Sequence, residues 1–135
     1  MSLTPSEREH ARDVALDAAC AAGELLLAYL GHLDRARIGT KSAARDLVTE
    51  ADLASERCLV AALRAAFPAH AIESEEAVRD AASAQPRWFL DPLDGTVNFV
   101  HGLPCFAVSM GLFVDGVPEV AVVHAPRLSE TFHAV

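Results

Sequence analysis

The hydrophobic pattern of the chain changes at Pro68, and no other feature of the sequence restricts the fold as strongly. Before this proline, apolar residues recur at the three- and four-residue spacing of an amphipathic helix. They predict one helix from Thr4 to about Leu30, ended by Gly31, and a second helix from near Thr49 to the proline, which cannot continue it. The segment between the two helices is predicted to be irregular.

Beyond residue 68 the apolar runs are short, as in strands. The dipeptide Asp115-Gly116 separates two of these runs and is a strong signal for a two-residue hairpin turn. The fold class is therefore predicted to be α+β, with two long helices packed on an antiparallel sheet. The predicted strands are residues 71–72, 88–90, 106–114, 117–124 and 130–135.

Composition and charge exclude several classes of function. The chain has 135 residues, of which 52% are hydrophobic, so it is not intrinsically disordered. Its net charge of −8 disfavours polyanions, and we expect no nucleic-acid partner. The apolar runs fall well short of the ~20 residues of a membrane span, and no signal peptide is visible. Three cysteines without a CxxC spacing fit free thiols, so we expect a cytoplasmic protein without a membrane partner.

The segment 91–99, with the sequence DPLDGTVNF, carries the clearest sign of chemistry. The carboxylates of Asp91 and Asp94 flank a proline at the end of a strand, and Gly95 lets the backbone approach a ligand closely. Thr96 is predicted to cap a short helix, whose free N–H groups would face an anion such as phosphate. An ordinary Asx turn with a helix cap explains the same residues if the segment stands alone.

A second acidic motif, Glu75-Glu76, follows a short predicted strand. By itself such a pair is typical of a solvated surface. If it meets the segment 91–99, however, four carboxylates share one site, and a cation must neutralise them. Oxygen ligands favour Mg²⁺ over Zn²⁺, and the scattered histidines have no zinc-site spacing.

Three blocks of the sequence together resemble the inositol monophosphatase family, within the lithium-sensitive, metal-dependent sugar phosphatases. The blocks are Lys41 with DLVTEAD at 46–52, the pair Glu75-Glu76, and WFLDPLDGTVNF at 88–99. The resemblance implies that residues 1–135 form the N-terminal, metal-binding half of the layered αβαβα sugar-phosphatase fold, with the C-terminal half absent. Family members are longer, and their second half supplies a further Asp ligand in a Trp-Asp-x-x-Ala motif that this sequence lacks.

The resemblance also implies a set of metal ligands. A first Mg²⁺ would be bound by Glu75, Asp91 and the carbonyl of Leu93. A second Mg²⁺ would be bound by Asp91 and Asp94, and Glu76 would stand behind these ligands.

For catalysis, the resemblance implies that Glu75 and the Thr96 hydroxyl hold the attacking water, with Asp52 accepting a hydrogen bond from Thr96. Lys41 would lie on a mobile loop that closes over the metals. Two plainer interpretations stay open: Asp52 as a helix cap and Lys41 as a solvated loop residue. The implied substrate-binding residues are Glu75, Leu93, Asp94, Gly95 and Thr96.

The activity implied is Mg²⁺-dependent hydrolysis of myo-inositol monophosphate, in which two metals activate water. Its substrate would be a small phosphomonoester, and the full-length family suggests a homodimer. Two alternatives remain: a phosphatase of another sugar or nucleotide phosphate, or a non-catalytic half-domain that acts in assembly or binding.

Overall fold

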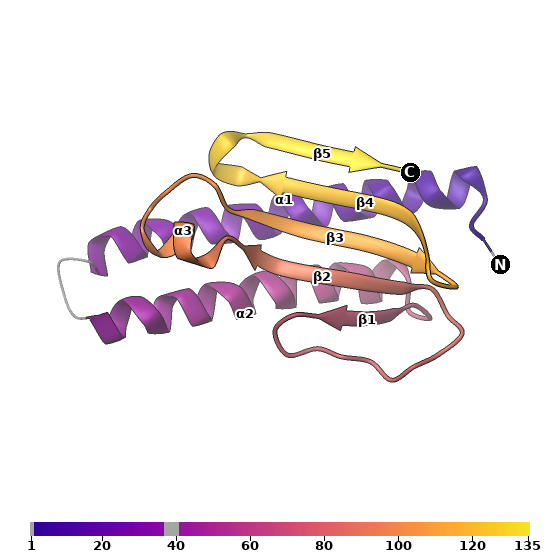
Figure 1. Cartoon of the computed structure of the whole chain (residues 1–135), viewed down its shortest axis with the longest axis horizontal. Coiled ribbons are helices and arrows are strands. Elements are labelled where there is room, and N and C mark those ends of the chain that lie inside the picture. Colours follow the sequence, from indigo (N-terminus) through magenta and orange to yellow (C-terminus); the bar gives the residue numbers. More distant parts are fainter. Residues whose placement is uncertain (1, 37–40) are drawn as a thin grey trace.

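Two long helices lie across one face of a five-stranded sheet (Figure 1). The computed structural model describes residues 2–36 and 41–135, with the backbone alone for 34–36 and 41–44. The strands follow one another across the sheet in chain order, from β1 to β5. The elements are α1 (Pro5–Ala36), α2 (Lys41–Ala66), β1 (Ala71–Ser74), β2 (Arg87–Asp94), α3 (Thr96–Val100), β3 (Ala107–Val114), β4 (Val117–Ala125), the 3₁₀ turn η1 (Pro126–Leu128) and β5 (Glu130–Ala134).

The predicted α+β class is confirmed, but the sheet is mixed. Strands β2 to β5 form an antiparallel meander, whereas β1 pairs with β2 in parallel, with Ile72 opposite Trp88. The connection between β1 and β2 returns the chain to the end where β1 began, so both strands run the same way. The predicted hairpin is also confirmed, because Asp115 and Gly116 both adopt positive φ, at 50° and 77°.

The predicted bounds of the two helices were wrong. Helix α1 continues through Gly31 to Ala36, and α2 begins at Lys41. Glycine costs a helix about 1 kcal/mol relative to alanine, but Leu33 beyond it is fully buried and offsets that cost. Thr49 lies inside α2 and its hydroxyl donates to the Arg45 carbonyl at 3.1 Å, so it does not begin the helix.

The start of α1 agrees with its sequence signal. The backbone N–H of Glu7 donates to Thr4 Oγ1 at 3.2 Å, and the N–H of Thr4 donates to the Glu7 carboxylate at 2.7 Å. These two bonds are a capping box, which satisfies N–H groups that have no partner within the helix.

The core lies between the helices and the sheet. Small side chains on α1, such as Ala15 and Ala19, allow the helix to pack closely on α2 and β4. Trp88 and Leu112 fill the sheet side of this layer and are fully buried. The other face of the sheet is open: Phe89, Val123 and Phe132 are at least 38% exposed.

The length and composition of helix α1 are relevant to the predicted absence of a membrane-spanning segment. Over Pro5–Leu33 it is long and apolar enough to cross a membrane by length and composition, which the short apolar runs did not indicate. In this fold its buried face packs on α2 and β4, and the core helix of a globular domain meets the same test.

Candidate active site

Parallel pairing of β1 with β2 brings the two predicted acidic motifs together. Ser74 lies opposite Leu90, and the next residue, Glu75, donates its N–H to the Leu90 carbonyl at 3.1 Å. The carboxyl ends of both strands therefore meet at one edge, with Glu75 beside Asp91. An antiparallel arrangement of these two strands would have placed the motifs at opposite edges.

Helix α2 brings a further carboxylate to this edge, that of Asp52. The side chain is 9% exposed, and among the described residues its Oδ1 has no hydrogen-bond partner. We call Asp52, Glu75, Glu76, Asp91 and Asp94 the site cluster.

The segment 91–94 departs from regular sheet pairing, and this frees its carboxylate and carbonyl groups to contact residues outside the sheet. The pairing of β2 with β3 shifts register between Asp91 and Asp94, because Pro92 has no N–H to donate to the ladder. The N–H of Leu93 donates to Asp91 Oδ1 at 3.3 Å, as expected for an Asx turn. The carbonyls of Pro92 and Leu93 are thereby left for partners outside the sheet.

Two predicted roles in this loop are corrected by the structure. Gly95, with φ of 85°, is the N-cap of α3, and Thr96 is the first helical residue. The Thr96 hydroxyl donates to the Leu93 carbonyl at 3.3 Å, so the expected bond to Asp52 is not formed. Asp52 is also no helix cap, because it lies well inside α2. A Cβ on Gly95 would come within 2.7 Å of the Cys105 carbonyl oxygen, so the position requires glycine.

Burial and neighbouring charges raise the pKa of three members of the site cluster. Burial, together with the charges of Glu76 and Asp91, raises the pKa of Asp52 from its ordinary 3.8 to about 7. The pKa of Asp91 rises to about 6 through burial, then through the charges of Glu75 and Asp94. Burial also raises the pKa of Glu76. None of the ion pairs in the described part of the chain involves these five residues.

The site cluster has the oxygen ligands that a divalent cation requires, although its side chains are not arranged in a coordination geometry. All of its donors are oxygens, and the buried Oδ1 of Asp52 lacks a partner, as expected where a hydrated cation belongs. As the described side chains stand, no three His, Cys, Asp or Glu residues are arranged to hold a metal ion. A hollow of about 220 Å³ opens beside Glu75 and Asp91, and one of about 410 Å³ beside Asp94 and Gly95.

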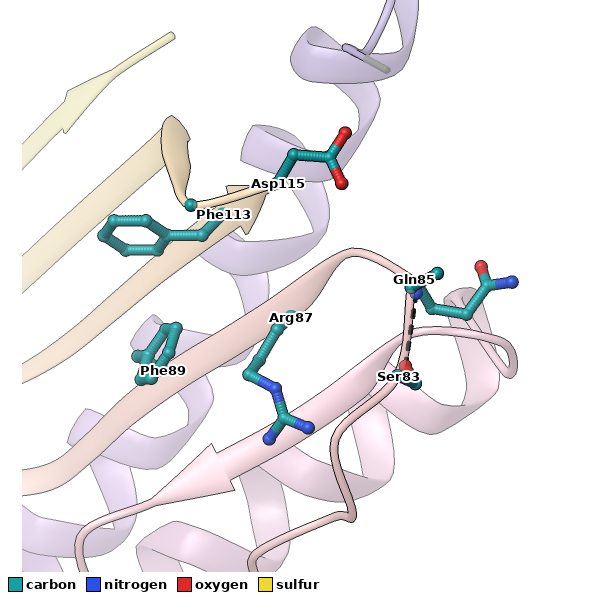
Figure 2. A pocket seen from close by; sticks show the side chains of 8 residues that line it. Ser83, Gln85, Arg87, Phe89, Phe113 and Asp115 are labelled. Carbon is teal, nitrogen blue, oxygen red and sulfur yellow. Dashed lines mark hydrogen bonds between the residues drawn. The ribbon is translucent and has the colours of Figure 1, made fainter.

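Another hollow of about 410 Å³ lies on the open face of the sheet (Figure 2). Phe89 and Phe113 form one wall, with their ring centroids 5.2 Å apart, and Arg87 lies beside them. None of the predicted site residues lines it.

Sequence reasoning missed two buried polar residues of α2 that hold the site cluster in place. The hydroxyl of Ser55 donates to the Pro92 carbonyl at 2.7 Å, and the carboxylate of Glu56 accepts from the N–H of Ala77 at 2.8 Å. Their signal was their position three and four residues after Asp52, which places all three on one helical face. The side chain of Lys41, a predicted site residue at the start of α2, lies outside the described residues.

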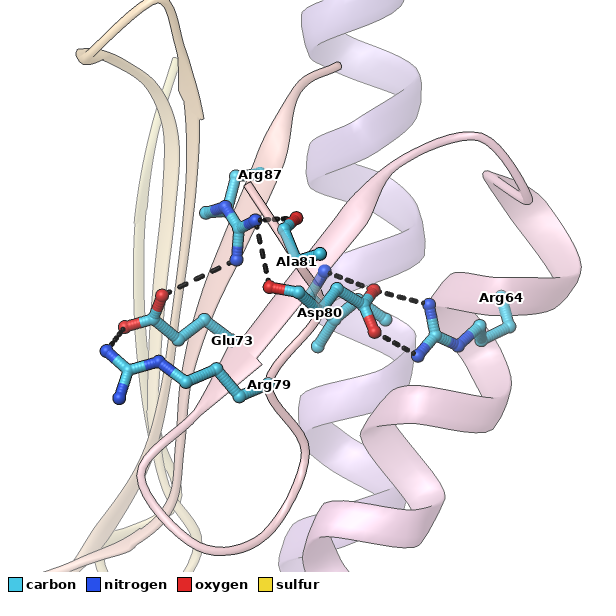
Figure 3. Close-up of polar contacts among 7 residues, drawn as sticks. Arg64, Glu73, Arg79, Asp80, Ala81 and Arg87 are labelled. Carbon is cyan, nitrogen blue, oxygen red and sulfur yellow. Dashed lines mark hydrogen bonds and ion pairs between the residues drawn. The ribbon is translucent and has the colours of Figure 1, made fainter. Parts of the chain in front are cut away.

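A second group of acids lies close by, and arginines neutralise it (Figure 3). Asp80 accepts two hydrogen bonds from Arg64, at 2.7 and 2.9 Å. Glu73 accepts from Arg79 at 3.0 Å and from Arg87 at 3.4 Å. We call these five residues the arginine-paired cluster.

Comparison with known proteins identifies the class of this fold and then its family. Among solved structures, an inositol monophosphatase from Anabaena superposes with a TM-score of 0.79 at 37% identity, over 94% of this chain and 44% of that one. A sequence model of the inositol monophosphatase family matches residues 7–135. The chain belongs to the inositol monophosphatase family, as its three sequence blocks predicted.

Two curated relatives carry different names. The Nus factor SuhB of Pseudomonas aeruginosa is 46% identical over 125 residues, which are 90% of this chain and 46% of that protein. The fructose-1,6-bisphosphatase/inositol-1-monophosphatase of Thermotoga maritima is 39% identical, over 83% of this chain and 42% of that protein. The chain spans about half the length of the curated relatives it matches.

Proposed function

We propose that residues 1–135 are the metal-binding half of a Mg²⁺-dependent phosphatase that acts on myo-inositol monophosphate. The observation that carries this proposal is the site cluster, where five carboxylates, of which Asp52 is buried and Asp91 half-buried, lie close together without a described ion-pair partner. A bound divalent cation would remove that repulsion and attract the anionic substrate to an acidic protein. Membership of a family named for inositol monophosphatase supports the reaction class.

Each residue of the site cluster has a role in this proposal. Glu75, Asp91, Asp94 and the Leu93 carbonyl would hold two Mg²⁺ ions, and Glu76 would add negative charge behind them. Bound Mg²⁺ would polarise the phosphoryl group and lower the pKa of the attacking water.

The remaining contacts would orient water and phosphate. Asp52 has an unpartnered Oδ1, which would accept a hydrogen bond from water. The N–H groups of Gly95 and Thr96, at the start of α3, would face the phosphate. The Thr96 hydroxyl, which donates to the Leu93 carbonyl at 3.3 Å in this fold, would be the group that orients the attacking water.

The choice of inositol over other phosphomonoesters rests on the family resemblance. The two activities in the name of the Thermotoga relative keep another sugar phosphate as an alternative. We also retain the homodimer of the whole protein, its cytoplasmic location and the absence of nucleic-acid and membrane partners as predictions.

A non-catalytic role in assembly is the second candidate. Two observations favour it: similar proteins are named Nus factor SuhB, and the open face of the sheet exposes Phe89, Val123 and Phe132. Exposed apolar surface of this kind is typical of protein contacts.

Phosphate release from inositol 1-phosphate distinguishes the two candidates. The chain would be assayed alone and joined to the C-terminal half of the Anabaena inositol monophosphatase, with Mg²⁺ or with EDTA. We expect Mg²⁺-dependent turnover in the joined protein, far less in the chain alone, and a loss of at least ~100-fold in kcat for Asp91→Asn. Asp80→Asn, in the arginine-paired cluster, is the matched control and should keep its turnover. Turnover of the joined protein that survives both EDTA and Asp91→Asn would exclude the proposed site.

A further inference from the structure

Helix α2 directs three buried polar side chains, Asp52, Ser55 and Glu56, towards the two loops of the site cluster. Their spacing of three and four residues places them on one face of the helix. Glu56 is only 3% exposed, and Ser55 is fully buried. Burying a carboxylate is costly unless hydrogen bonds compensate it, so the contacts of Glu56 need an explanation.

Those contacts are with the loop that carries Glu75 and Glu76. Glu56 Oε2 accepts the N–H of Ala77 at 2.8 Å and, more weakly, the N–H of Val78 at 3.4 Å. These two residues directly follow the acidic pair. Because N–H bonds to an ionised carboxylate are stronger than those between neutral groups, they fix the backbone at this point.

The same loop is held at its other end by the sheet. Glu75 donates its N–H to the Leu90 carbonyl at 3.1 Å, and Ser74 donates to the Val78 carbonyl at 2.7 Å. The acidic pair therefore lies in a short turn, with β2 on one side and Glu56 on the other. Ser55, the neighbour of Glu56 on α2, holds the Pro92 carbonyl in the second loop.

We propose that Glu56 is a positioning residue through which α2 fixes the Glu75-Glu76 loop against the segment 91–94. The inference deepens the proposed function, because the distance between the two loops decides whether their carboxylates can share a cation. Ser55 and Glu56 each hold one of the two loops, and a single rigid turn of helix sets that distance.

The choice of a carboxylate at position 56 supports this role. A glutamine could accept the same N–H groups without adding a negative charge to the site. Glu56 instead places a negative charge, on a residue that is 3% exposed, directly behind the loop that carries Glu75 and Glu76. Such a charge is unfavourable in the isolated fold and favourable once a cation is bound.

Amide hydrogen exchange and Mg²⁺ titration calorimetry on this chain test the inference. In Glu56→Ala we expect exchange at Ala77 and Val78 to rise at least ~10-fold, and Mg²⁺ affinity to fall by ~10–100-fold. Glu56→Gln should restore most of the amide protection but only part of the affinity. Glu50→Gln removes the same charge from an exposed position of α2 and should change neither.

The outcomes separate this inference from the proposed function. Unchanged exchange at Ala77 and Val78 in Glu56→Ala would overturn it, as would raised exchange with unaltered Mg²⁺ affinity. A wild-type chain that binds no Mg²⁺ would count against the proposed function, whereas a rise in exchange that glutamine rescues would still support positioning by Glu56. If Glu56→Ala does not fold, Glu56→Asp decides, because it keeps the charge and shortens the side chain: unchanged exchange at Ala77 and Val78 would overturn the inference.

Discussion

The acids of the site cluster and those of the arginine-paired cluster are the same residue types, some only a few positions apart, yet their electrostatics are opposite. In the arginine-paired cluster, the hydrogen bonds from Arg64 lower the pKa of Asp80 to about 2, with further help from the N–H of Ile72. In the site cluster, burial and neighbouring carboxylates raise the pKa of Asp91 to about 6. Both clusters include residues of the short stretch 73–80.

This difference indicates that hydrogen-bond and ion-pair partners, rather than residue type, distinguish an acidic residue with a structural role from one with a functional role. Asp80 ties the long β1–β2 connection to α2 through Arg64, and Glu73 pairs with Arg79 of this connection and with Arg87 of β2. Arg87 also donates to the carbonyls of Asp80 and Ala81, which holds the connection to β2. In the site cluster, ionisation of Asp52, Glu76 and Asp91 is unfavourable, as the raised pKa values of these three groups indicate. Unfavourable charge kept in a buried place is a mark of functional sites.

Mg²⁺ should distinguish the two clusters most strongly. At 100 times the dissociation constant, a bound ion adds about 2.7 kcal/mol to the free energy of unfolding. Thermal melts should show this gain in wild type and in Asp80→Asn, and its loss in Asp91→Asn. A gain of equal size in Asp91→Asn would remove the distinction between the clusters.

The pH dependence of stability should have opposite signs in the two clusters. Since the folded pKa of Asp52 is about 7 and its ordinary value is 3.8, its contribution is fully present below pH 3.8 and is lost as pH rises to about 7. Asp52→Asn should therefore raise the free energy of unfolding at pH 8 by roughly 1–3 kcal/mol. Urea unfolding at pH 4, 6 and 8 measures the difference, which should shrink towards pH 4; a variant less stable than wild type at pH 8 would contradict the assignment.

Asp80→Asn should have the reverse effect and a smaller one. The folded pKa of Asp80 is lowered to about 2, so its contribution is present above pH 3.8 and is lost as pH falls towards 2. Because the side chains of Arg64 and Asp80 are 42% and 30% exposed, solvent screens the pair, and we expect a loss of about 1 kcal/mol at pH 7. The same urea series provides the measurement, and a stabilised variant at pH 7 would speak against a structural role.

The smallest effect is expected within the arginine-paired cluster itself. The side chain of Arg79 is 75% exposed, so Arg79→Ala should change the free energy of unfolding by less than about 0.5 kcal/mol. Arg87→Ala is the comparison, since that side chain is 17% exposed and also donates to two backbone carbonyls. Equal losses in the two variants would show that burial does not set the strength of these pairs.

The sequence by itself determined most of the features that depend on neighbouring residues. It predicted both long helices, the capping box at Thr4, the hairpin at Asp115-Gly116 and the family, because propensities, caps and turns act over a few residues. The two acidic motifs were also visible, since each is a short continuous segment.

Only the tertiary structure decided how these local pieces meet. Burial of Leu33 carried α1 through Gly31, which the local signal had marked as its end. The parallel pairing of β1 with β2 placed Glu75 beside Asp91, and the buried face of α2 gave Ser55 and Glu56 their partners. Those partners lie 37 and 21 residues away along the chain, so no short window of sequence contains both members of either contact.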